Sequence, residues 1–491
     1  MKTHLLTIAF LFLSLQAFAQ NKPDIVLSDS LFFFRTSMDL GGNIHMGFKG
    51  SYSGIYYQTF NSSGIPIRNQ RSIISSPWAG SPALAESKGS VLFLWNEMTM
   101  IFSSYIKGGV LDLAKDSLRT DIRISSTSGD IYRRSPEISL LNDSLAAGVW
   151  TGGSQVGHYD GVYGRLLSTE LESKGPEVRF NDNENAECSS AKIAVKPAGS
   201  GYWVFWRDNR SGSYKVYARE VSITGIPQGS SILVSEDSRL TDLWFLDAAV
   251  DPKGNFTAVW GGQLNGLGYQ IQLRRFDKDG KPLGASENVT SKEGGVGVAP
   301  SVSVAIDSLC NTVVAWDQEE WKENMKIYAQ RYSPDNKPIG TPFRVSGENE
   351  EYYQTLPIIK LKNGKIYCFW SESRDTTIER SKLSILEFND PVADVKGSGE
   401  GAAVRGFMLS QNYPNPFNPA TTISYMIPKE SFVELKVFDM LGREAATLVN
   451  KEQSAGQYTV HFDGSSLPSG IYIYTIRAGS YTGSKKLMIL K

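Results

Sequence analysis

The sequence predicts an all-β protein in which a seven-bladed β-propeller is followed by a small Ig-like β-sandwich. Tryptophans recur in the first part of the chain at intervals of 54 to 56 residues, at Trp95, Trp150, Trp206, Trp260, Trp316 and Trp370. The chain holds 46 glycines and its aromatic content is 11%, a composition typical of short strands joined by many tight turns. A second group of short strand-like runs, separated by turn residues, fills positions 407–491.

Each repeated tryptophan closes a nearly continuous apolar run, as in VLFLW, YWVFW and TVVAW. Such runs indicate strands that are buried on both faces. We call these tryptophans, together with Phe48 in the first repeat, the anchors. Six residues before each anchor the chain has a turn residue, namely Gly42, Gly89, Ser144, Ser200, Gly254, Cys310 and Gly364. A third strand follows each anchor, and a further turn leads to a short fourth strand. Four antiparallel strands in about 55 residues correspond to one propeller blade.

Phe48 takes the anchor position in the first repeat, which brings the number of expected blades to seven across residues 24–388. The last repeat lacks a fourth strand. The run Ile25–Asp29 resembles the fourth strands of other repeats, so we expect residues 25–29 to pair with the strand at 381–388. Such pairing would close the ring and remove an open sheet edge.

The start of the chain reads as a secretory signal peptide over residues 1–19. Lys2 provides the positive charge, Leu5–Leu15 form a short apolar stretch, and Ala17–Ala19 provide small residues for cleavage. No later segment approaches the length of a membrane-spanning helix, so we expect no membrane span. Residues 389–406 are rich in small residues and are expected to be a linker to the last domain.

Composition excludes several classes of function. With 50 basic and 51 acidic residues, the chain has no basic field for nucleic acid. The three cysteines, Cys188, Cys310 and Cys368, are too few for a disulfide framework. Beyond the signal peptide only His45, His158 and His461 remain, which gives little support to a histidine zinc site or a Ser-His-Asp triad.

Residues 407–491 contain QNYPNPFNP, VFDMLGR, FDGSSLPSGIYIY and a terminal KKLMILK. These motifs resemble the Por-type C-terminal sorting domain of type IX secretion cargo. The residues that carry the resemblance are Pro414, Asn415, Pro416, Gly442, Gly470, Tyr472, Lys485 and Lys486. The resemblance implies export across a Gram-negative outer membrane, with the type IX machinery and its sorting and attachment enzyme as partners. The protein is then either anchored at the cell surface or released.

The propeller is expected to carry any ligand on the face formed by the longer loops, those between second and third strands and those between blades. These loops contain aromatic, guanidinium and carboxylate groups that suit a sugar or peptide surface. The candidate residues are Trp78, Tyr132, Arg134, Tyr159, Arg210, Trp244, Trp321 and Arg374. The favoured interpretation is a non-catalytic module that binds an extracellular glycan or protein.

Two alternatives stay open. A glycoside hydrolase or lyase would need two carboxylates facing each other, and the candidates are Glu187, Asp208, Asp317, Glu319 and Glu372. A structural or adhesin scaffold would need no small ligand. We expect no cofactor, because the oxygen-rich run Asn181–Asn185 lacks the spacing of a calcium loop and is favoured as a solvated loop.

Overall fold

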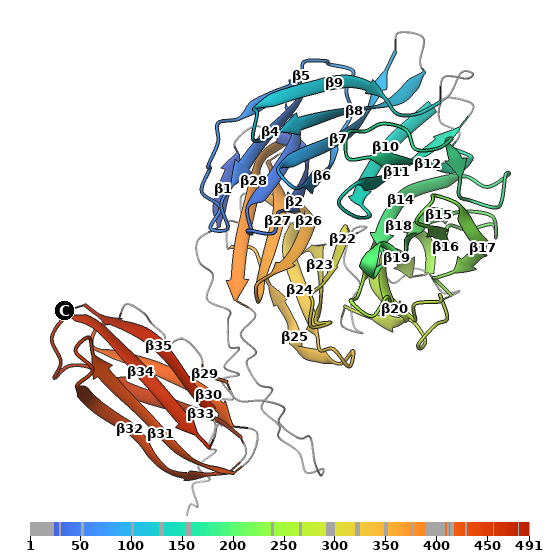
Figure 1. The fold of residues 1–491 in the computed structure, drawn as a ribbon. Coiled ribbons are helices and arrows are strands. Elements are labelled where there is room, and N and C mark those ends of the chain that lie inside the picture. The colour runs from blue at the N-terminus through green and yellow to red at the C-terminus, as the bar shows by residue number, and fades with distance from the viewer. Residues whose placement is uncertain are drawn as a thin grey trace, which may run out of the picture. The chain divides into compact units, whose positions relative to one another are not determined.

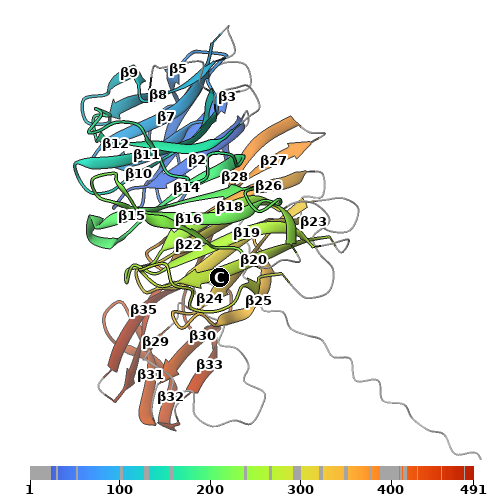
Figure 2. The ribbon, with the colours of Figure 1, turned by 90° about the vertical axis from the view of Figure 1, so that its right-hand side faces the viewer.

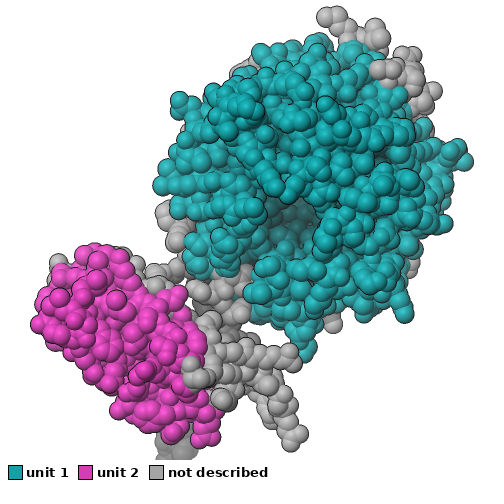
Figure 3. Space-filling view, in the orientation of Figure 1, with its two compact units in different colours: residues 1–388 teal, residues 389–491 magenta. Residues whose placement is uncertain are grey.

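The computed structural model describes residues 24–490 with internal gaps. The gaps are 29–30, 51–53, 100–102, 127–131, 154–158, 237–239, 265–267, 291–299, 320–324, 348–351, 375–376, 388–407, 410–411, 413–416, 428–429, 455 and 480. The signal peptide expected at 1–19 and the linker expected at 389–406 lie outside the described residues. The chain divides into two compact units, Met1–Phe388 and Asn389–Lys491 (Figure 3).

The first unit is a ring of seven four-stranded antiparallel sheets, which confirms the seven-bladed propeller (Figure 1). The first strands of neighbouring blades contact one another, so they form the inner wall of the ring. Figure 2 shows the blades after a quarter turn, with strands of successive blades running side by side.

The first six blades each follow the order of the chain from the inner strand outward. Blade one comprises β2 (Leu31–Met38), β3 (Ile44–Gly50), β4 (Ile55–Phe60) and β5 (Arg71–Ile74). Blade two comprises β6 (Ala83–Ser87), β7 (Ser90–Met98), β8 (Ser104–Asp112) and β9 (Ser117–Arg123). Blade three comprises β10 (Tyr132–Leu140), β11 (Leu145–Gly153), β12 (Gly161–Ser168) and β13 (Val178–Arg179). Blade four comprises β14 (Cys188–Val195), β15 (Gly201–Asp208), β16 (Lys215–Ser222) and β17 (Pro227–Leu233). Blade five comprises β18 (Leu240–Val250), β19 (Phe256–Leu264), β20 (Tyr269–Phe276) and β21 (Glu287–Asn288). Blade six comprises β22 (Val302–Ile306), β23 (Thr312–Glu319), β24 (Met325–Tyr332) and β25 (Pro338–Arg344). A short 3₁₀ turn, Pro197–Gly199, joins β14 to β15.

The seventh blade is built from both ends of the propeller. Its strands are β26 (Tyr353–Lys362), β27 (Lys365–Arg374), β28 (Thr377–Glu387) and, as the outer strand, β1 (Ile25–Ser28). Ile25 faces Leu383 and Val26 faces Lys382 in the antiparallel register. The predicted ring closure is therefore confirmed, and the sheet edge that β28 would otherwise expose is covered.

The anchor residues pack between blades, as their apolar strands predict. All six repeated tryptophans are at most 1% exposed, and Phe48 is 2% exposed. Each lies in a separate apolar cluster that joins its own blade to the preceding one, and seven such clusters close the ring. Trp206 also donates its indole N–H to Asp208, two residues on, at 2.8 Å. Trp316 does the same with Gln318 at 3.1 Å.

The turns between inner and second strands also follow from the sequence. In three of them an aspartate binds the asparagine four residues later through both its carboxylate oxygens, in the pairs Asp39–Asn43, Asp251–Asn255 and Asp307–Asn311. The residue before each asparagine has a positive φ, which glycine adopts at Gly42 and Gly254 and which Cys310 adopts at φ 66°.

Bulges interrupt the inner strands, and they were not apparent in the sequence. In blades three, four and seven the pairing register shifts at a residue with positive φ, namely Ser135, Ser190 and Leu356. A bulge adds one residue to one strand and re-aims the side chains around it.

The second unit is a β-sandwich with one buried core. One sheet contains β29 (Met408–Leu409), β30 (Ala420–Ile427) and β33 (Gly456–Asp463), and the other contains β32 (Glu444–Gln453), β31 (Ser431–Asp439), β34 (Gly470–Ala478) and β35 (Tyr481–Ile489). β32 was missed in the sequence because it is a polar edge strand in which half of the side chains are exposed.

Candidate functional site

The loops between second and third strands and the loops between blades lie on one face of the propeller, because successive strands are antiparallel. Many of these loops fall in the gaps of the structure. The loops of this face that are described without a gap are 75–82 between blades one and two, 180–187 between blades three and four, and 209–214 within blade four.

Two aromatic side chains are turned outward at the start of β18. Leu243 faces Gly262 and Leu246 faces Trp260, so Trp244 and Phe245 share a single partner position on β19. This bulge removes both residues from the alternating pattern of the strand. Trp244 is 46% exposed and Phe245 is 38% exposed, although their neighbours Leu243 and Leu246 are buried. The backbone therefore presents a pair of aromatic rings to solvent.

Arg207 lies beside Trp244 and is held in place by several contacts. Its guanidinium carbon lies 5.6 Å from the centroid of the Trp244 ring and 4.9 Å from that of Tyr214. The Arg207 side chain donates to Ser189 Oγ at 2.7 Å and to the carbonyl oxygen of Leu243. A cation over an aromatic face is attracted by the negative face of the ring. The platform of Trp244, Phe245, Arg207 and Tyr214 is thus fixed before any ligand binds.

A carboxylate completes this platform. The Tyr214 hydroxyl donates to Glu187 Oε2 at 2.9 Å, and the backbone N–H of Glu187 donates to Asn209 Oδ1 at 2.9 Å. Burial and the hydrogen bond with Glu187 raise the pKa of Tyr214, so it stays a neutral donor at physiological pH. Glu187, Tyr214 and Arg207 together offer acceptors and donors at the edge of an apolar surface.

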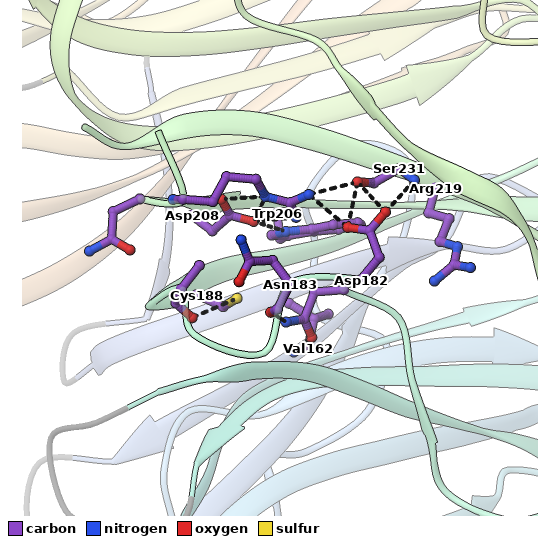
Figure 4. Close-up of polar contacts among 12 residues, drawn as sticks. Val162, Asp182, Asn183, Cys188, Trp206, Asp208, Arg219 and Ser231 are labelled. Atoms are coloured by element: carbon purple, nitrogen blue, oxygen red, sulfur yellow. Dashed lines mark hydrogen bonds and ion pairs between the residues drawn. The ribbon is translucent and has the colours of Figure 1, made fainter. Parts of the chain in front are cut away.

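A partly buried ionic network around Asp208 and Asp182 supports the loops beside the platform (Figure 4). Arg210 donates to both oxygens of Asp208 at 2.6 to 2.9 Å and to Asp182 at 2.6 Å. Asp182 in turn accepts the backbone N–H and the hydroxyl of Ser231. Asp182 belongs to the loop that follows blade three, whereas Ser231 lies on the outer strand of blade four, so this network ties the two blades together.

The charges of the network stabilise one another. Burial alone would raise the pKa of Asp182, but hydrogen bonds from Ser231 and Arg210 lower it to about 2. Burial alone would lower the pKa of Arg210, and the carboxylates of Asp208 and Asp182 raise it above its ordinary value. Every nitrogen of the Arg210 guanidinium is engaged. Arg210 thus acts as a structural clamp in this state of the protein, with the Tyr217 ring 4.0 Å from its guanidinium carbon.

The other candidate binding residues occupy separate places on the loop face. Arg134 is exposed and stacks over Tyr159 at 3.7 Å, and Arg374 is exposed beside Tyr352 at 5.1 Å. Trp78 is half exposed in the loop between blades one and two, whereas Tyr132 is buried. Trp321 lies outside the described residues.

Sequence reasoning missed Arg207 and Phe245. Arg207 directly follows the anchor Trp206 at the end of an apolar run, and nothing in the local sequence distinguishes it as a surface residue. Phe245 lies in an apolar run in which only the bulge distinguishes outward from inward positions.

The carboxylates considered for catalysis are mostly buried in the sheets. Asp208, Asp317 and Glu372 are at most 2% exposed. Asp317 accepts the backbone N–H groups of Ser301 at 2.7 Å and Leu356 at 3.0 Å, and burial raises its pKa to about 7. Glu372 accepts from Gln354 at 3.1 Å and lies 3.7 Å from Lys382. Asp317 and Glu372 are thus bonded to neighbouring strands and loops of the propeller.

The run Asn181–Asn185 uses its oxygens within the protein. Asn181 is buried, and its side chain accepts the backbone N–H of Val162 and donates to the carbonyl oxygens of Asp160 and Asn183. Among the described residues, no group of three or more His, Cys, Asp or Glu side chains could hold a metal ion.

All three cysteines are free, and Cys188 and Cys368 are buried. Burial raises the pKa of Cys188 to about 12, which leaves its thiol unreactive at physiological pH.

The residues that carry the resemblance to a sorting domain lie mainly on the second unit's turns and last strands. Gly442 adopts φ 77° in the turn after β31, and Tyr472 donates its hydroxyl to the carbonyl oxygen of Pro468 at 3.1 Å. Gly470 begins β34, and Lys485 and Lys486 are exposed on β35. Pro414, Asn415 and Pro416 lie outside the described residues. Asn412, which was not singled out, is buried and bonds Thr421 and the Tyr474 hydroxyl.

Comparison with solved structures bears on the fold of the first unit. A PL25 ulvan lyase, a polysaccharide lyase solved bound to -[GlcA(1-4)Rha3S]-, superposes with a TM-score of 0.54 at 8% identity, over 74% of this chain and 96% of that one. An α-L-arabinanase from Penicillium chrysogenum, complexed with arabinobiose, gives a TM-score of 0.45 at 10% identity, over 75% and 98% of the two chains. At 8% identity, the likeness to the ulvan lyase shows the fold alone. No curated protein matches the chain.

The second unit is the part of the chain that bears on how the protein is exported. No helix among the described residues has the length and apolar character needed to cross a membrane. Residues 411–490 match the secretion system C-terminal sorting domain. The protein is therefore a type IX secretion cargo that carries a β-propeller to the surface, or to the outside, of a Gram-negative cell.

Proposed function

We propose that the propeller of this exported protein is a non-catalytic glycan-binding module, and that it binds polysaccharide at the platform around Trp244. One observation carries the proposal. The bulge in β18 turns Trp244 and Phe245 outward while Arg207, Tyr214 and Glu187 are locked beside them. Two exposed aromatic rings at one bulge are an arrangement that ordinary strand packing does not require.

The chemistry of the platform suits a sugar better than a protein. The apolar face of a pyranose can stack on the Trp244 ring, and its hydroxyls can reach the Arg207 guanidinium and the Glu187 carboxylate. A stable protein interface usually buries about 800 Å² on each partner, which two aromatic residues alone do not supply. The rigid support of Arg207 reduces the entropy lost on binding.

The test is a polysaccharide array probed with the mature full-length protein, followed by titration calorimetry on each hit. We expect Trp244→Ala to weaken binding by at least about tenfold, because a central aromatic contact commonly contributes more than 1 kcal/mol. Phe432→Ala is the matched control, since Phe432 is an aromatic residue of similar exposure, 49%, in the second unit. It should bind as the parent does.

Two results would overturn the proposal. One is the absence of binding to every polysaccharide tested, and the other is a Trp244→Ala variant that binds as tightly as the parent. Each hit is also incubated with the protein, and new reducing ends or unsaturated products are measured. Turnover of a polysaccharide would mean that the propeller is a lyase or hydrolase and not a non-catalytic binding module.

A further inference from the structure

The inner strands line an open cavity of about 390 Å³ in the centre of the propeller. It is lined by the second halves of the inner strands of six blades, so it lies toward the short turns that join first and second strands, away from the loop face. Figure 3 shows the propeller hollowed at its centre. Alanines such as Ala85, Ala194 and Ala249 form much of the wall and leave the space open.

A layer of charged residues borders this cavity, and most of its members are paired. Glu137 on β10 binds Lys192 on β14 at 2.5 Å and Arg35 on β2 at 3.6 Å. Burial alone would raise the pKa of Glu137, but Lys192 and Arg35 lower it, so it is ionised. Asp247 on β18 accepts the hydroxyl of Ser303 at 3.1 Å and the backbone N–H of Val304 at 3.0 Å.

Lys360 on β26 is the exception. Its side chain lines the cavity, and it forms no ion pair or hydrogen bond with any residue that the structure describes. Burial lowers its pKa, the more distant carboxylates of Asp247 and Glu137 raise it, and the cations Lys192 and Arg35 lower it again. Lys360 is half-buried in the cavity wall, and an ammonium group held there without a partner is destabilised, which an anionic group from a ligand would relieve.

The rest of the wall offers polar groups rather than further positive charge. Ser37 on β2 and Ser139 on β10 line the same cavity, as does Glu86 on β6, whose carboxylate accepts the backbone N–H of Gly89 at 3.1 Å. Thr36 also lines it, and its buried hydroxyl has no hydrogen-bond partner among the described residues. A bare inorganic anion would meet Glu86 as a like charge, whereas a ligand hydroxyl could donate to that carboxylate.

We propose that this central cavity binds a small polyhydroxylated monocarboxylate, a sugar acid, with its carboxylate against Lys360 and its hydroxyls against Ser37, Ser139 and Glu86. A single negative charge matches the ammonium of Lys360, which is unpaired within the described part of the chain. The hydroxyls match the side chains of Ser37, Glu86 and Ser139 on the inner strands of blades one to three. The cavity lies within the size range of pockets for small ligands, and it is separate from the platform around Trp244.

The test uses the mature full-length protein and titration calorimetry with glucuronate and galacturonate. Glucose, acetate and sulfate are the comparison ligands, because each lacks either the negative charge or the hydroxyls. At least one sugar acid should bind, and each comparison ligand should bind at least about tenfold more weakly. Equal binding of acetate or sulfate would overturn the proposal, and so would no binding of either sugar acid.

Variants locate the site. Lys360→Met keeps the length of the side chain and removes the charge, and it should weaken sugar-acid binding at least about tenfold. Lys253→Met is the matched control, since Lys253 is exposed in the turn between β18 and β19, and it should bind normally. Ser139→Val keeps every charge but removes one wall hydroxyl, and it tests the same site if Lys360→Met does not fold. Sugar-acid binding that survives in either folded cavity variant contradicts the inference.

The two proposed sites can fail independently. Trp244→Ala should leave sugar-acid binding unchanged, and Lys360→Met should leave polysaccharide binding unchanged. Loss of sugar-acid binding in Trp244→Ala would place the sugar acid on the loop face and would overturn the assignment to the central cavity.

Discussion

The closure of the ring by β1 can be tested with a pair of adjacent substitutions. Leu27 is 6% exposed and packs with Phe34, Phe48, Phe369 and Leu383 between blades seven and one. Val26, its neighbour on the same strand, points the other way and is 45% exposed. Leu27→Ala and Val26→Ala therefore change the same strand, one on its buried side and one on its open side.

The expected cost of Leu27→Ala follows from what it removes. Three buried carbon atoms at about 0.8 kcal/mol each give about 2.4 kcal/mol of lost transfer free energy. The cavity left between Phe48 and Phe369 adds to this, for a total of about 3 to 4 kcal/mol. Val26→Ala should stay within about 0.5 kcal/mol of the parent, as surface substitutions generally do.

Urea unfolding followed by tryptophan fluorescence measures this difference. All ten tryptophans precede residue 389, so the signal reports the propeller and not the sorting domain. Leu27→Ala should lower the midpoint at an unchanged slope. Equal midpoints for the two variants would mean that β1 does not contribute to the stability of the closed ring, and the reasoning would fail.

Three further outcomes are expected. Trp260→Ala should destabilise the propeller by about 3 to 5 kcal/mol, seen as a lower urea midpoint, because it empties the centre of the contact between blades four and five. Asp317 has a pKa of about 7 in the folded protein against an ordinary value of 3.8, so the folded state retains its proton to higher pH than the unfolded state. Its contribution to stability should therefore fall by up to about 4 kcal/mol as the pH rises from 4 to 7, and urea midpoints measured across this range should decline less in Asp317→Asn. Deleting residues 407–491 should abolish export, measured by immunoblot of the culture medium and cell surface, while the fluorescence transition of the propeller stays at its parental midpoint; continued export would contradict the role of the sorting domain.

The parts of the fold that could be predicted from sequence are those fixed by pattern. The tryptophan spacing predicted the blades because each anchor must fill the same space between neighbouring sheets, and all six are buried. The likeness of residues 25–29 to the fourth strands of other repeats predicted the ring closure, because the last blade needs a fourth strand of the same kind. Gly42 and Gly254 marked turns whose backbone requires a positive φ.

The parts that could not be predicted depend on register and on partners that are distant in sequence. The bulges occur at ordinary residues such as Ser190 and Leu356, whose positive φ no local pattern announces. The bond between Arg210 and Asp182, 28 residues away, was not apparent in the sequence, and a ligand contact at Arg210 stays a prediction. Lys360 was not singled out in the sequence, since only ring closure places it in a central cavity.

The seventh blade also has a consequence for how the protein is made. Its outer strand, β1, is synthesised first, whereas its partner β28 comes more than 350 residues later. Pairing across such a separation is slow, because the entropy of closing the long loop is lost before the contacts between β1 and β28 form. The ring therefore cannot be completed until the whole propeller has been delivered. A chain truncated before β28 would leave β1 without its partner and the seam between blades seven and one open, so closure distinguishes finished cargo from incomplete chains.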